Sequence, residues 1–158
     1  MAEMLNIKPG EVPENDAGYL EMMTKVIFMG GLNRQVVESK WDGFLSAFEE
    51  FDPAGVASFT EEDVERLSED ERIVRYGAKI RAVVKNAGRM VEIADEHGSF
   101  GQWLRSSVRD EGVDDTARAL SRHFSYVSEE SARRYLYAVG EDVGEVTKEV
   151  RRKYGPGE

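Results

Sequence analysis

The clearest chemical feature of the sequence is a run of basic side chains with no acid among them. The run comprises Arg72, Arg75, Lys79, Arg81, Lys85 and Arg89. The spacing is helical and predicts that Arg75, Lys79, Arg81, Lys85 and Arg89 share one arc of a helix. On such an arc, lysine and arginine can contact phosphates and release counterions. Two interpretations remain open, a solvated helix face and a phosphate-contacting face. For the second interpretation, Lys79, Arg81 and Lys85 are the candidate contacts.

The charge of the chain is unevenly distributed. The formal net charge is -10, whereas proteins that bind nucleic acids are usually basic. The excess of acids lies before Ile73, and the rest of the chain is nearly neutral. Such polarity can steer a charged ligand to one side of a molecule. The acidic half also leaves open a function as a domain that binds a basic partner protein.

Cysteine chemistry is excluded because the chain contains no cysteine. It therefore has no disulfide, no thiolate metal ligand and no cysteine nucleophile. The only histidines are His97 and His123, and no phosphate-cradling glycine loop, zinc-protease motif or nucleophile elbow is present. We expect no metal and no cofactor. No stretch has the length and apolarity of a membrane helix, so we expect a cytoplasmic protein that does not engage a membrane.

Hydrophobic periodicity predicts an all-α protein, since no segment alternates between apolar and polar residues. We expect residues 1–16 to form an irregular N-terminal arm and residues 17–154 to form a single helical domain. Capping residues mark several helix starts, notably Asn33, Thr60, Ser99 and Ser128. Within the domain the predicted helices cover residues 17–29, 33–51, 77–96, 99–108, 114–124, 128–139 and 143–154, with short helical segments starting at Pro53 and after Thr60.

Several motifs resemble those of the DNA-3-methyladenine glycosylase I family. The most specific block is FDPAGVASFTEEDVERLSEDERIVRYGAKIRAVVKNA, from Phe51 to Ala87. Val12-Pro13-Glu14 matches a segment before the family's first helix, and residues 124–127 match its second helix-hairpin-helix element. The resemblance covers about residues 12–140. It implies an all-α, helix-hairpin-helix DNA glycosylase-like domain.

The resemblance also implies a function on double-stranded DNA. Such an enzyme extrudes a damaged base into a pocket, because the target atom is otherwise buried in the base stack. The hairpin would bind the DNA backbone, with main-chain N–H groups at a helix start donating hydrogen bonds to phosphate. On this basis Val127, Ser128 and Ser131 join the candidate DNA contacts.

This sequence departs from the family at the pocket and at the zinc site. Val26 stands where the family has a glutamate that hydrogen-bonds the flipped base, and Arg34 replaces a pocket tryptophan. Together with Met29, these two residues are the predicted pocket lining. The family's zinc site is excluded by the lack of cysteine. After the hairpin, Glu129 and Glu130 place two negative charges at the helix start that the resemblance implies would face a DNA phosphate.

Two main hypotheses follow. The first is hydrolytic excision of an alkylated base in base-excision repair, with Asp142, Glu145 and Glu149 as candidates for activating water or stabilising a sugar cation. These acids lie beyond the hairpin, where related glycosylases use an aspartate. The second is a catalytically inactive descendant of the fold that acts as a DNA-binding or protein-interaction module.

Overall fold

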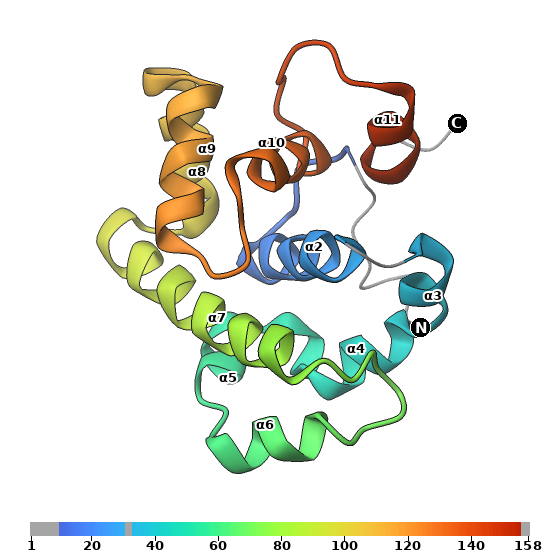
Figure 1. Cartoon of the computed structure of the whole chain (residues 1–158). Coiled ribbons are helices and arrows are strands. Elements are labelled where there is room, and N and C mark those ends of the chain that lie inside the picture. Colours follow the sequence, from blue (N-terminus) through green and yellow to red (C-terminus); the bar gives the residue numbers. More distant parts are fainter. Residues whose placement is uncertain (1–9, 31–32, 156–158) are drawn as a thin grey trace.

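The computed structural model describes residues 10–30 and 33–155 and confirms the all-α prediction for them. The chain is folded into helices joined by short turns (Figure 1). The described part contains no strand and no helix that is long and apolar enough to cross a membrane. In order, the elements are α2 (Asp16–Met29), α3 (Arg34–Ser39), α4 (Trp41–Ala47), η1 (Glu49–Phe51), α5 (Pro53–Ala57), α6 (Glu61–Leu67), α7 (Gly77–His97), α8 (Phe100–Glu111), α9 (Val113–His123), α10 (Glu129–Ala138) and α11 (Lys148–Tyr154).

The predicted helix starts are confirmed where side chains cap them. The side chain of Asn33 accepts a hydrogen bond from the amide of Gln35, and Ser99 accepts one from Gln102. Thr60 and Ser128 each form a capping box with the residue three positions later. Each cap satisfies an amide that the first turn of a helix leaves without a partner.

The predicted helix over residues 33–51 is wrong, because the chain breaks there into α3, α4 and η1. Residues 49–51 have positive φ angles of 52°, 59° and 62°, which turn the chain back sharply. The turn brings the Phe51 ring to 5.6 Å from Trp41, and Trp41 also stacks on Phe44 at 4.7 Å. Burying these aromatic rings together outweighs the regularity of one long helix.

The last helix begins later than predicted, at Lys148 rather than Val143. Gly140 and Gly144 have φ angles of 95° and 86°, in the left-handed region that favours glycine, so the chain loops between them. Thr147 then caps α11. We call residues 140–147 the α10–α11 loop.

Of the expected N-terminal arm, residues 10–15 are described, and they form neither helix nor strand. Residues 1–9 lie outside the described part. The arm lies along the end of α10, where the amide of Gly10 donates to the carbonyl of Ala138 at 2.6 Å. Asp16 belongs to α2, and its carboxylate accepts hydrogen bonds from the amides of Phe100 and Gly101. The start of α2 is thereby tied to the start of α8.

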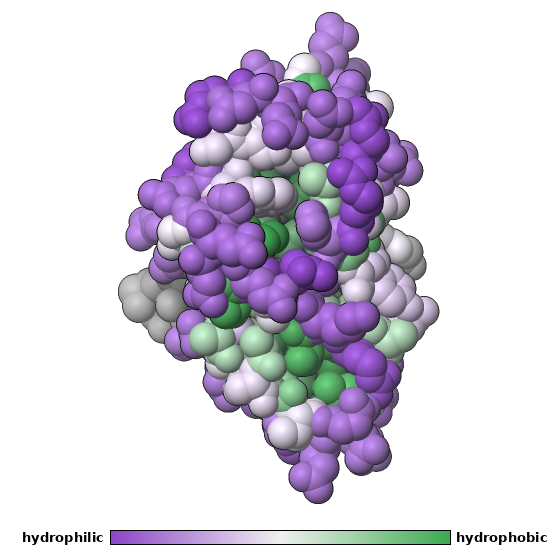
Figure 2. Space-filling view, turned by 90° about the vertical axis from the view of Figure 1, so that its left-hand side faces the viewer, coloured by the Kyte–Doolittle hydropathy of each residue, from purple (hydrophilic) through white to green (hydrophobic). Residues whose placement is uncertain are grey.

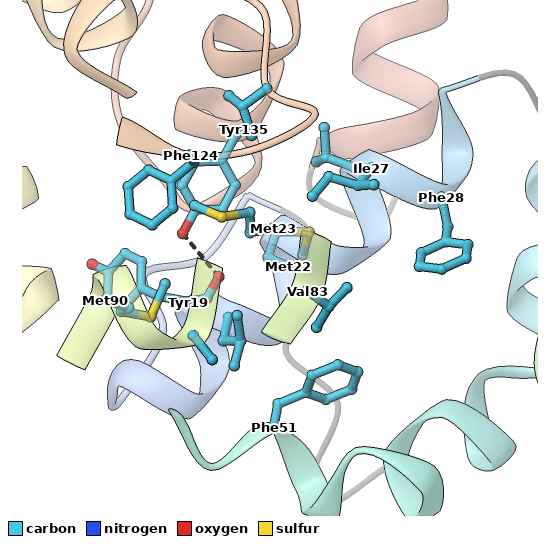
Figure 3. Close-up of a cluster of buried hydrophobic side chains, with 14 of the residues drawn as sticks. Tyr19, Met22, Met23, Ile27, Phe28, Phe51, Val83, Met90, Phe124 and Tyr135 are labelled. Carbon is cyan, nitrogen blue, oxygen red and sulfur yellow. Dashed lines mark hydrogen bonds between the residues drawn. The ribbon is translucent and has the colours of Figure 1, made fainter. Parts of the chain in front are cut away.

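Helix α2 is the centre of the core, since every residue from Gly18 to Met29 is buried. It lies between α7 and α10 in Figure 1, and both helices contact it. Figure 3 shows side chains of α2 meeting those of α7 and α10, with the Tyr135 hydroxyl donating to the carbonyl of Tyr19 at 2.8 Å. Figure 2 shows the opposite character on one outer face, which is mostly hydrophilic with hydrophobic side chains visible in its lower half.

Candidate DNA-binding and base-binding site

A cavity of about 620 Å³ lies between the end of α2, α10, the α10–α11 loop and α11, in the upper right of Figure 1. Its size falls within the usual range for small-ligand sites. One part of the wall is apolar and is formed by Met29, Val143, Val146, Val150 and Tyr154. The other part is charged and is formed by Glu130, Arg133, Arg134, Glu145, Glu149 and Lys153.

Most charged groups of the cavity are engaged by neighbours. Arg134 pairs with Glu130 at 3.0 Å, and Lys153 lies 3.8 Å from Glu149. Arg133 pairs with Asp114 at the start of α9. Glu145 is the exception, because it has no ion-pair partner among residues 10–30 and 33–155. A carboxylate on the rim is therefore available to a ligand or a water molecule.

The structure separates the predicted pocket residues. Met29 lines the cavity, whereas Val26 is not part of its wall and is only 4% exposed within the core. Arg34 also lies outside the cavity. Its guanidinium bonds to Glu38 at 2.9 Å and to the carbonyl of Arg152 at 2.7 Å, so it ties α3 to α11. Of the predicted lining, the structure brings only Met29 to the cavity.

The three acids proposed from the family likeness also differ in position. Glu145 and Glu149 lie in the cavity wall. Asp142 does not line it, and its carboxylate accepts a hydrogen bond from the amide of Gly144 at 3.0 Å, which stabilises the α10–α11 loop. No cluster of three or more His, Asp or Glu side chains in the described residues has a metal-binding arrangement.

The expected basic arc of α7 is partly wrong, because Lys79 is buried with 7% of its surface exposed. Lys79 precedes Val83 by four residues, and side chains four apart share a helix face. Its amino nitrogen lies 5.6 Å from the Phe28 ring and 5.3 Å from the Tyr76 ring. Burial lowers the pKa of Lys79. The aliphatic stem of a lysine packs well on apolar surface, which explains how this face accepts it.

The other two cations of α7 remain at the surface. Arg81 is exposed and forms an ion pair with Glu61 at the start of α6. Lys85 is exposed and has no ion-pair partner in the described part of the chain. Lys85 also lines a smaller cleft that α7 forms with the end of α9, together with Arg89, Arg122 and His123.

Helices α9 and α10 contact each other and are joined by a hairpin over residues 124–127. Asn86 of α7 holds this hairpin, with its amide donating to the Ser125 carbonyl at 3.1 Å and accepting from the Ser125 amide at 2.7 Å. Asn86 is 1% exposed, so both bonds are shielded from water. The sequence reading missed Asn86, although a lone amide among the apolar residues of α7 was a detectable signal.

The start of α10 is already capped within the chain. The Ser131 amide donates to Ser128 Oγ at 3.0 Å, and the Ser128 amide donates to Ser131 Oγ at 2.9 Å. Val127 is buried, Ser128 is exposed and Ser131 is half-buried. Two of the amides expected to face phosphate therefore have serine partners, and Glu129 and Glu130 add negative charge beside them.

Known proteins with the same fold and related sequences match this chain. A family model described as methyladenine glycosylase matches residues 9–135. DNA-3-methyladenine glycosylase 1 of Escherichia coli (strain K12) is 34% identical over 111 residues, which are 70% of this chain and 59% of that protein. The alignment thus spans less than two thirds of the curated relative.

Solved structures of the same family share the fold. A crystal structure of 3-methyladenine DNA glycosylase I superposes with a TM-score of 0.75 and 26% identity, covering 84% of this chain and 83% of that one. The Staphylococcus aureus 3-methyladenine DNA glycosylase I, described for its recognition of 3-methyladenine, gives a TM-score of 0.76 at 21% identity over 86% and 82% of the two chains. With the family model covering most of its length, the chain belongs to the methyladenine glycosylase family.

Proposed function

We propose that this protein is a DNA glycosylase that removes an alkylated base from double-stranded DNA by hydrolysis. The observation that supports this most directly is the cavity of about 620 Å³ beside the α9–hairpin–α10 unit. Its apolar wall offers a face against which a flat base can pack, formed by the half-buried Val143, Val146 and Val150 over the buried Met29 and Tyr154. The cavity is open to solvent on the side of the α10–α11 loop, where Glu145 lies exposed.

The chemistry requires little from the protein when the substrate is a cationic alkylated purine. Water adds to C1′ of the sugar, and the N-glycosidic bond breaks with its electron pair passing to the base, which leaves neutral. We assign Glu145 to accept the proton of that water, because it lines the cavity without an ion-pair partner among the described residues. Its negative charge also stabilises positive charge developing on the sugar.

Base selectivity should differ from that of the relatives named 3-methyladenine glycosylases. Val26 cannot accept a hydrogen bond, and Arg34 is held by Glu38 and the Arg152 carbonyl. In place of a glutamate, the cavity offers Met29 and the aromatic ring of Tyr154. We therefore expect the enzyme to select alkylated bases mainly because their N-glycosidic bond is weaker, and less through a hydrogen bond to the edge of the base.

The DNA contacts in this proposal come from α7 and the hairpin. Arg81 and Lys85 supply positive charge on the outer face of α7. The other candidate contacts are Val127 at the end of the hairpin, and Ser128 and Ser131 at the start of α10. We also propose a cytoplasmic location, because the relatives are named as enzymes that act on DNA. Neither contact set needs a bound metal.

The alternative function, an inactive DNA-binding or protein-interaction module, is favoured by one specific observation. Two ion pairs lie within the cavity wall, Arg134 with Glu130 and Lys153 with Glu149, and Arg133 pairs with Asp114 outside it. These pairs neutralise most of the wall's charge and leave Glu145 as the single acid of the wall without an ion-pair partner in the described residues. If Glu145 only interacts with solvent, the protein can bind a ligand in the cavity but does not catalyse release of a base.

Release of free base from methylated duplex DNA, followed by chromatography and mass spectrometry, separates the two functions. The proposal expects release above a control without protein, and a marked loss of release with Glu145→Gln. Glu111→Gln is the matched control, since Glu111 is exposed at the end of α8 and does not line this cavity. Tight binding of the duplex without release would establish the inactive module instead.

A further inference from the structure

Two tyrosines lie together on the surface where the start of α7 meets the hairpin. Tyr76 is 47% exposed and Tyr126 is 51% exposed. Their ring centroids are 6.5 Å apart and the planes are nearly perpendicular, at 77°. Most other aromatic rings of the chain are buried in the core. The tyrosine pair therefore presents an unusual area of aromatic surface to solvent.

The backbone at Tyr126 is strained to present its ring. Its φ angle is 61°, in the left-handed region that bulky side chains rarely adopt. Burial of the ring does not offset this strain, because half of the side chain is exposed. The hydrogen bonds of Asn86 to Ser125 fix the residue just before it. Strained residues held in this way are concentrated at functional sites.

A buried cation lies next to the tyrosine pair. The amino nitrogen of Lys79 is 5.3 Å from the Tyr76 ring, and the side chain is 7% exposed. In the described part of the chain, this group has two aromatic rings as neighbours and no carboxylate ion pair. Buried charges in proteins are normally paired. The anion that would complete this site is not supplied by the described residues.

We propose that Tyr76, Tyr126 and Lys79 form a subsite for a single unpaired nucleotide of DNA. The face of one ring stacks on the base that is left without a partner when the damaged nucleotide is extruded, and the other ring, which is nearly perpendicular to it, contacts the edge of that base. Lys79 binds a neighbouring phosphate. Aromatic rings beside a cation are the usual means of holding an unpaired nucleotide.

This inference rests on the proposed function, so its test uses two duplexes of one sequence. One duplex is intact, and the other carries a tetrahydrofuran abasic analogue, which leaves the opposite base unpaired. Fluorescence anisotropy measures the affinity for both. The double variant Tyr76→Leu/Tyr126→Leu should lose affinity for the abasic duplex by roughly 5- to 150-fold and leave the intact duplex unaffected. The matched control Tyr76→Phe/Tyr126→Phe keeps the rings and should keep the affinity.

Lys79 is tested by the salt dependence of binding. Lys79→Met should lower the slope of log Kd against log salt concentration by about 0.9 on both duplexes, as expected for one lost phosphate contact. Thermal melting of each variant establishes that it is folded. An unchanged preference for the abasic duplex in the leucine variant refutes stacking, and an unchanged slope refutes the phosphate contact. If the wild-type protein binds neither duplex, the proposed function fails and the subsite fails with it.

Discussion

Val26→Glu introduces the residue that the family resemblance implies for the base pocket, and we expect this change to destabilise the protein. Val26 is 4% exposed and lies on α2, which is buried on all sides. A carboxylate at this position would lose its hydration. Burial raises the pKa of such a group by roughly 3–4 units, which corresponds to roughly 4–5.5 kcal/mol at pH values above the raised pKa. This loss is comparable to the whole stability of many domains.

The loss of stability in Val26→Glu should depend on pH. The introduced carboxyl has a higher pKa in the folded protein than in the unfolded chain. The penalty is therefore smallest below the unfolded pKa of about 4.3 and grows as pH rises toward the folded pKa. Val26→Gln has similar size and no titration, so its loss of stability should be the same at pH 5 and pH 8 relative to wild type.

Urea unfolding of both variants at pH 5 and pH 8 measures these free energies. If Val26→Glu is as stable as wild type at pH 8, position 26 is not buried as described. A gain in excision of 3-methyladenine by the same variant would show that position 26 faces an accessible pocket.

Three further changes test other parts of the structure. Asn86→Ala removes both bonds to Ser125 and should cost about 1–3 kcal/mol in urea unfolding, with weaker DNA binding because the hairpin is released; unchanged values for both would contradict the anchoring role. Tyr135→Phe removes the bond to the buried Tyr19 carbonyl and should cost about 1–3 kcal/mol without changing DNA affinity. Lys79→Met removes a buried cation and should melt at or above the wild-type temperature at pH 7. Burial lowers the pKa of Lys79, so the free energy of unfolding of the wild type should increase relative to Lys79→Met as pH rises toward the ordinary lysine pKa. A difference that does not change with pH would contradict this burial.

The fold was largely predictable because its signals are local. Caps such as Thr60, Ser99 and Ser128 mark helix starts in the sequence itself, and each is confirmed. The break between α4 and η1 was not predictable, since it depends on Phe51 reaching back to stack on Trp41. The helical pattern of apolar residues continues through both Trp41 and Phe51, so it does not indicate that the chain turns back between them.

The candidate site was predictable only in part. Met29, Glu145 and Glu149 meet in one cavity, but the sequence alone does not show that the α10–α11 loop closes over the end of α2. Lys79 was expected on an exposed arc but is 7% exposed, and its four-residue spacing to the buried Val83 already indicated this burial. The role of Tyr126 depends on a positive φ angle that no local pattern indicates in a tyrosine.

The most direct test of the proposed glycosylase activity is release of free base from a methylated duplex by the wild-type protein under single-turnover conditions. We expect release well above the control without protein, with the rate falling by about 100-fold in Glu145→Gln, which is the lower end of the usual contribution of a general base. Both proteins should bind the abasic duplex equally. Equal release by the two proteins would contradict the role of Glu145, and no release by the wild-type protein would contradict the glycosylase function itself.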